Sequence, residues 1–129
     1  MQLITHLAFD GHAEAAMTFY TKALAGQFEG PIHRNPDKPE RIMHCQARFD
    51  SFTLMASDSD KDLTTSQKAN VDLHLFFDNL DQAQQAFDAF AAVGQVDYPF
   101  EKQFWGAYFG RVLDPWGIPW SFSYQESQA

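Results

Sequence analysis

One stretch of this 129-residue chain occurs twice. Residues 6–27 and 74–95 align without a gap at a spacing of 68 positions, and 9 of the 22 aligned residues are identical. The identical pairs are His6/His74, Leu7/Leu75, Phe9/Phe77, Asp10/Asp78, Ala15/Ala83, Phe19/Phe87, Ala23/Ala91, Gly26/Gly94 and Gln27/Gln95. An internal repeat indicates that a chain is built from copies of one structural unit. We therefore expect two halves of the same design.

The periodicity of apolar residues predicts the same elements in each half. In residues 2–10 apolar side chains alternate with others, which is typical of a strand, and in 12–25 they recur at helical spacing. Further strands are predicted at 27–34, 41–49 and 52–57. The second half repeats this order, with a strand at 71–77, a helix at 80–93, and strands at 95–100, 104–113 and 116–125. Gly26 and Gly94 stand where a helix often ends on a left-handed glycine.

This order predicts an α+β domain made of duplicated βαβββ modules. We expect a single domain over 1–129, with a first half at 1–57, a polar linker at 58–69 and a second half at 70–129. Leu7, Phe9, Leu75 and Phe77 should face the helices. The opposite faces of the two curved sheets would then line a shared concave cleft.

Charge and cysteine content limit the partners that we expect. Nine Lys and Arg against 17 Asp and Glu give a net charge of −8, which disfavours nucleic acid and anionic membrane surfaces. No apolar run is long enough for a membrane span, and the N-terminus lacks the features of a signal peptide. One cysteine cannot form an internal disulfide. A cytoplasmic protein is therefore expected.

Four segments carry a resemblance to a known family. They are Phe9 to Tyr20, His44 to Arg48, Leu54 to Asp58, and Phe104 to Trp120, which is the most specific. Over nearly the whole chain, they resemble the PhnB-like branch of the vicinal oxygen chelate superfamily, which includes glyoxalase I, bleomycin-resistance proteins and extradiol dioxygenases. The resemblance implies the duplicated fold, the cleft and a homodimer, to which the many aromatic residues also point.

The same resemblance places a metal on the first and last strands of each half. Carried over to this chain, the four positions fall on Ile4 (or His6), Met55, Asp72 (or His74) and Ser121. Ile4 and Met55 are not useful ligands for a hard divalent ion. The usual tetrad is therefore broken, and we expect no cofactor, although a divalent metal stays open as an alternative.

His6 and His74 are the most suggestive pair, because the repeat relates them. One interpretation is that each is a polar cleft residue held by a hydrogen bond, or an acid–base group. The other is that His6, His74 and Asp72 form an irregular two-histidine, one-carboxylate metal site.

Three further patterns have an ordinary interpretation. His44 is next to Cys45, but neighbours on a strand point to opposite faces, so Cys45 is expected in the core. Arg48 and Arg111 occupy equivalent places in the two halves and predict surface ion pairs, or alternatively an anion clamp. The acidic run from Asp58 to Asp62 lacks the glycine and glutamate of a calcium loop.

Two hypotheses for function follow. The first is a small-molecule-binding protein, not necessarily an enzyme, whose ligand contacts His6, Met55, His74, Ser121 and Trp105. The second is a metal-dependent lyase, isomerase or dioxygenase that uses His6, Asp72 and His74. The sequence leaves the ligand and any reaction open.

Overall fold

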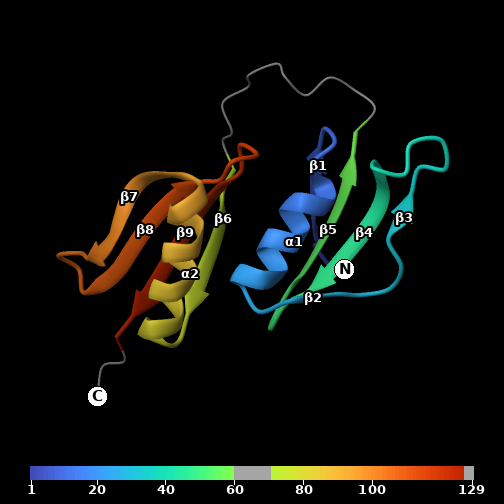
Figure 1. The fold of residues 1–129 in the computed structure, drawn as a ribbon. Helices are drawn as coiled ribbons and strands as arrows, with labels where there is room; N and C mark the ends of the chain where they lie inside the picture. The colour runs from blue at the N-terminus through green and yellow to red at the C-terminus, as the bar shows by residue number, and fades with distance from the viewer. Residues whose placement is uncertain (60–70, 127–129) are drawn as a thin grey trace. The chain divides into compact units, whose positions relative to one another are not determined.

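The computed structural model describes residues 1–59 and 71–126. The chain forms two compact units, Met1–Gln67 and Lys68–Ala129, which we call unit 1 and unit 2 (Figure 1). All but the first two residues of the predicted linker, and most of the acidic run from Asp58 to Asp62, lie outside the described residues.

Unit 1 is a mixed sheet with one helix. Its elements are β1 (Thr5–Phe9), α1 (Ala13–Ala23), β2 (Gln27–Phe28), β3 (His33–Arg34), β4 (Ile42–Arg48) and β5 (Thr53–Asp58). The strand order is β1-β5-β4-β2, and β3 also pairs with β4. β1 is parallel to β5, and the other pairs are antiparallel.

Unit 2 repeats this topology. Its elements are β6 (Leu73–Phe77), α2 (Leu80–Val93), β7 (Gln95–Lys102), β8 (Ala107–Leu113) and β9 (Pro119–Gln125). The strand order β6-β9-β8-β7 matches that of unit 1, and the first strand is again parallel to the last. The predicted α+β fold with two βαβββ modules is therefore confirmed.

The elements differ from the prediction mainly in the first half. Residues 27–34 do not form one strand, because Gly30 adopts a positive φ of 74° between the short strands β2 and β3. β8 begins at Ala107, so Trp105 belongs to the turn before the strand. The predicted turn from Asp114 to Gly117 is confirmed by the hydrogen bond from Gly117 N to Asp114 O at 3.1 Å.

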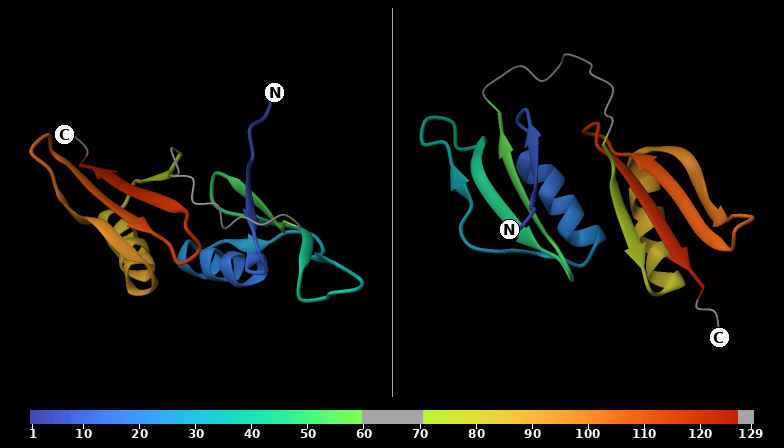
Figure 2. Two further views of the ribbon diagram at one scale, coloured as in Figure 1. Left: turned by 90° about the horizontal axis from the view of Figure 1, so that it is seen from above. Right: turned by 180° about the vertical axis from the view of Figure 1, so that it is seen from behind.

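Each helix lies against one face of its own sheet (Figure 2). Leu7 and Phe9 are buried, as the alternation predicted. In unit 2 the ring of Phe90 packs against Trp120 and Phe122, at centroid distances of 5.1 and 5.2 Å. We call the opposite face of each sheet, which carries no helix of its own unit, its open face.

The two helices begin in different ways. Asn79 caps α2 locally, because its side chain accepts a hydrogen bond from Gln82 N at 2.9 Å. His12 precedes α1 without a side-chain cap. Instead, the Asp58 carboxylate accepts from Ala13 N at 3.0 Å and from Ile42 N at 2.9 Å. One side chain at the end of β5 thus holds both α1 and the start of β4.

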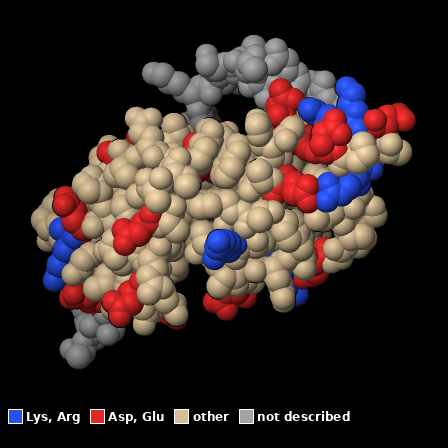
Figure 3. Space-filling model, viewed as in Figure 1, with Lys and Arg blue, Asp and Glu red and all other residues tan. Residues whose placement is uncertain are grey.

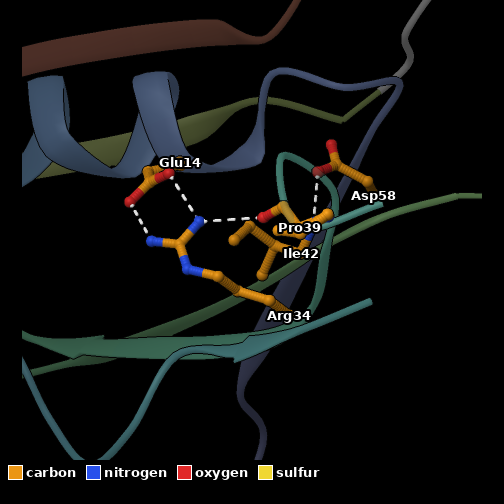
Figure 4. Close-up of polar contacts among 5 residues, drawn as sticks. All are labelled: Glu14, Arg34, Pro39, Ile42 and Asp58. Carbon is orange, nitrogen blue, oxygen red and sulfur yellow. Dashed lines mark hydrogen bonds and ion pairs between the residues drawn. The ribbon is translucent and has the colours of Figure 1, made fainter. Parts of the chain in front are cut away.

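A second polar contact fixes α1 to the segment before β4. Arg34 donates to both carboxylate oxygens of Glu14, at 2.6 and 3.0 Å, and to the carbonyl oxygen of Pro39 (Figure 4). These hydrogen bonds lower the pKa of Glu14 below its usual value. Both side chains are partly exposed, so we expect a modest contribution to stability.

Gly26 and Gly94 do not adopt the left-handed conformation that the sequence suggested. Gly94 has a φ of −112°, and in the first half Ala25 has the positive φ of 54°. A Cβ on Gly26 would overlap the ring of Phe49, and one on Gly94 would overlap the carbonyl oxygen of Leu113. Both glycines are therefore required because the helix end packs closely against the second-last strand.

The surface carries both signs of charge. Figure 3 shows acidic side chains spread over the face drawn, with basic ones set among them. In the described ranges, no helix is long and apolar enough to cross a membrane.

Candidate functional site

The repeated histidines make the same contact in both units. His6 Nε2 lies 2.9 Å from Ser57 Oγ, and His74 Nε2 lies 2.7 Å from Ser123 Oγ. Each histidine is on the first strand of its unit, and each serine is on the last strand, parallel to it. The duplication has therefore preserved a hydrogen-bonded histidine–serine pair on each open face.

Strand register explains this repetition. His6 is opposite Met55, and His74 is opposite Ser121. The bonded serine follows two residues later in both units, so it has the same face and the same diagonal relation to the histidine. The sequence predicted the two histidines as site residues but did not predict Ser57 and Ser123. These serines could have been found from their positions, two residues after the predicted site residues Met55 and Ser121.

Ser121 is almost completely buried, with 1% of its surface exposed, and it donates to Asp72 Oδ2 at 2.5 Å. Asp72 lies just before β6, two residues from His74. The alternation of a strand places these groups on one face. Three of the predicted site residues, Asp72, His74 and Ser121, are thus brought together in unit 2.

Aromatic rings surround His74. Its imidazole is stacked on Phe76 at a centroid distance of 4.2 Å and meets Phe109 edge-on at 5.9 Å. Tyr98 extends the group, because its ring is 6.0 Å from that of Phe109. The open face of unit 2 therefore combines aromatic rings with a few polar groups.

In unit 1 a histidine, His44, occupies the position that corresponds to Phe109 of unit 2. The ring of His44 lies 6.3 Å from that of His6 and 6.4 Å from that of His33.

Cys45 points to the other face and is buried, as predicted, and burial raises the pKa of its thiol to about 11. The thiol is therefore protonated near neutral pH, which makes it a poor nucleophile.

The predicted equivalence of Arg48 and Arg111 is wrong. Arg111 is opposite Ser121 on β9, whereas the residue opposite Met55 on β5 is Gln46. Gln46 is therefore the counterpart of Arg111. The repeat covers only the first strand and helix of each half, so it does not predict which residues of the later strands are equivalent. Each arginine has a long ion pair, from Arg48 to Glu29 at 3.8 Å and from Arg111 to Asp97 at 3.9 Å.

Trp105 lies in the turn between β7 and β8 and is 54% exposed. Its ring contacts that of Phe104 edge-on at 4.8 Å. A role in ligand binding stays a prediction for this residue, as does the shared cleft.

Two of the four positions that the family resemblance assigned to a metal carry poor ligands for a hard ion, since Ile4 offers no side-chain donor and Met55 offers only a thioether. With His6 or His74 as the alternative ligands, a metal site stays a prediction. Hard divalent ions prefer oxygen and imidazole ligands. Within residues 1–59 and 71–126, no group of three or more His, Cys, Asp or Glu is placed to hold a metal ion.

Comparison with protein families gives one broad match. The model of the Glyoxalase/Bleomycin resistance protein/Dioxygenase superfamily matches residues 3–122. The chain is 25% identical to protein YjdN of Escherichia coli over 148 residues, covering 99% of this chain and 98% of that protein. It is 32% identical to uncharacterized protein Mb0911c of Mycobacterium bovis, covering 92% of this chain and 80% of the relative.

Solved structures show the same architecture. Protein PA1353 from Pseudomonas aeruginosa superposes with a TM-score of 0.84 at 28% identity, covering 98% of this chain and 99% of that one. The PhnB protein from Bacillus cereus superposes with a TM-score of 0.86 at 22% identity, covering 96% and 99%. These neighbours agree with the PhnB-like resemblance of the sequence.

Proposed function

The chain belongs to the glyoxalase/bleomycin resistance protein/dioxygenase superfamily, and on that premise we propose that it binds a small molecule on the open faces of its sheets. The observation that carries the proposal is the repeated histidine–serine pair, His6 with Ser57 and His74 with Ser123. Packing alone does not require a polar pair at the same place in both units. Each imidazole uses Nε2 for the serine, so a ligand would bind at the other ring nitrogen.

The proposal concerns binding and does not depend on the superfamily's metal. Met55, opposite His6, would supply an apolar contact, and the buried Ser121, opposite His74, orients Asp72 through its hydroxyl. The geometry thus supports recognition of a polar ligand group by His6 and by His74.

Titration of labelled protein with a panel of small fragments, followed by amide NMR spectra, tests this function. Amides of β1, β5, β6 and β9 should shift, and His6→Ala and His74→Ala should each weaken binding about fivefold, the equivalent of one hydrogen bond. His12→Ala is the matched control, because His12 is exposed at the start of α1 and makes no capping bond. Shifts confined to other elements would contradict the proposal.

A metal-dependent lyase, isomerase or dioxygenase is the alternative. Elemental analysis of the purified protein separates the two functions. Stoichiometric Zn, Ni, Mn or Fe that disappears in the His6→Ala or His74→Ala variant would favour the alternative, and metal at trace level in all variants would favour metal-free binding.

A further inference from the structure

Arg111, on the open face of unit 2, has one hydrogen-bond donor, its Nε, that no described residue accepts from. Its Nε is buried and forms no hydrogen bond, and the ion pair with Asp97 Oδ2 has a length of 3.9 Å. A charge-assisted N–H···O bond is normally about 2.7–2.9 Å long. Arg34, in contrast, forms two such bonds with Glu14. A buried guanidinium N–H without an acceptor is unfavourable, so this position suits an acceptor from a ligand.

At the sheet position of Arg111, a positive charge is present in unit 2 and absent from unit 1. Arg111 is opposite Ser121, and at the equivalent place in unit 1 Gln46 is opposite Met55. Gln46 is neutral, and its Nε2 donates to Glu29 Oε1 at 3.3 Å. The same sheet position therefore favours an anion in unit 2 and not in unit 1.

The neighbours of Arg111 are aromatic. Phe109 precedes it by two residues on β8 and therefore shares its face. The ring of Phe109 contacts those of Tyr98 and His74, and Phe76, which is 79% exposed, stacks on His74. Aromatic surfaces beside a cation suit a flat apolar molecule that carries an anionic group.

We propose that the open face of unit 2 binds a small aromatic carboxylate, with the guanidinium of Arg111 as its anion contact. This inference rests on the proposed function and names the chemical class of the ligand. A carboxylate can accept two parallel N–H bonds from the planar guanidinium, which fixes its position and direction. The aromatic body of the ligand then packs beside Phe109 and His74.

Two carboxylates near the open face of unit 2, those of Asp72 and Asp97, would repel an anionic ligand. Asp72 accepts from the Ser121 hydroxyl, so part of its charge is compensated within unit 2. Asp97 competes directly with a ligand for Arg111. Asp97→Asn should therefore strengthen binding of a carboxylate, whereas it would weaken binding of a cation.

Benzoate and its neutral analogue benzamide are the probes for this test. In amide NMR titrations, we expect benzoate to shift His74, Arg111 and Ser121 and to bind the native chain at least tenfold more tightly than benzamide. Arg111→Gln, which copies Gln46 of unit 1, should remove that preference, and Arg111→Lys should reduce it. Asp97→Asn should strengthen benzoate binding several-fold. Arg48→Gln is the matched control and should behave like the native chain.

Four outcomes would each overturn the inference. Benzoate does not bind, or it binds no more tightly than benzamide. Alternatively, Arg111→Gln leaves benzoate binding unchanged, or the shifts lie outside unit 2. If neutral fragments still bind beside His74, the proposed function survives. If no fragment shifts either open face, both fall. Should Arg111→Gln not fold, the responses of Arg111→Lys and Asp97→Asn decide the question.

Discussion

At the scale of single residues, identity between the halves has two separate physical causes. His6 and His74 each bind a serine on the neighbouring strand, so they are repeated because of a polar contact on the open face. Gly26 and Gly94 are repeated because a side chain at either place would collide with the second-last strand. Only the first cause concerns the candidate site.

The close packing at Gly94 predicts that Gly94→Ala destabilises the protein. The new Cβ would overlap Leu113 O and approach Val112 Cγ1, and overpacking of this kind costs about 1–3 kcal/mol. Urea unfolding measures the change. The neighbouring Val93→Ala is the control, because Val93 is exposed and its replacement should alter stability by less than about 0.5 kcal/mol. Equal stability of the two variants would contradict this account.

At the scale of elements, the helix of each module is capped by a different kind of contact. α2 receives its cap from the adjacent Asn79, whereas α1 receives it from Asp58, which lies 45 residues away from Ala13. A local cap is visible in the sequence as a residue pattern. A cap from a distant strand becomes visible only when the sheet has formed.

Replacement of the two capping residues should therefore have unequal effects. Asn79→Ala should cost about 1 kcal/mol, the usual value for a lost cap. Asp58→Ala should cost about 2–3 kcal/mol, because it removes the acceptor of Ala13 N and Ile42 N together. Amide hydrogen exchange should show the loss of protection in α1 and β4 for Asp58→Ala, and in α2 for Asn79→Ala. Equal costs would argue against the bridging role of Asp58.

At the scale of the whole molecule, two modules of one topology carry different chemistry on their open faces. The register pairs His6 with Met55 and His74 with Ser121, and it places Gln46 and Arg111 at equivalent positions. At these positions unit 2 carries a cation and a buried hydroxyl where unit 1 carries a neutral amide and a thioether. Duplication followed by such local changes gives one fold with two unlike surfaces.

The homodimer predicted from the sequence is a proposal at this scale. Phe104 and Trp105 are 97% and 54% exposed in the turn before β8, and exposed aromatic pairs are typical of interfaces. Light scattering at micromolar concentration should give twice the chain mass of 14.7 kDa. Phe104→Ser with Trp105→Ser should shift the protein toward the monomer, and the control Leu3→Ser should not. A native chain of monomer mass would refute the dimer.

Several features of the fold could be predicted from the sequence because they depend on local spacing. Alternation predicted β1 and β6, and helical spacing with a capping pair predicted α2 from Leu80 to Val93. Gly30 divided the predicted strand at 27–34, because a positive φ interrupts pairing and the apolar pattern alone does not show it. Trp105 was expected on a strand that in fact begins two residues later.

For the candidate site, the sequence supplied His6 and His74 but not their partners. Ser57 and Ser123 became partners through the parallel pairing of the first and last strands, which stand at opposite ends of each module in the sequence. The sequence predicted that Arg111 is the counterpart of Arg48, because unequal segment lengths hide how β4 and β8 correspond. The pairing of Arg111 with Ser121 on β9 shows that this prediction is wrong.

By itself, the sequence determined the duplicated α+β architecture, the buried sides of the strands and the family. The tertiary structure decided which side chains meet: each histidine with its serine, and Asp58 with two distant amides. It also left the Nε of Arg111 without a hydrogen-bond partner among the described residues. The physical reason is that periodicity acts between neighbours in the chain, whereas register and close packing act between strands that are far apart in it.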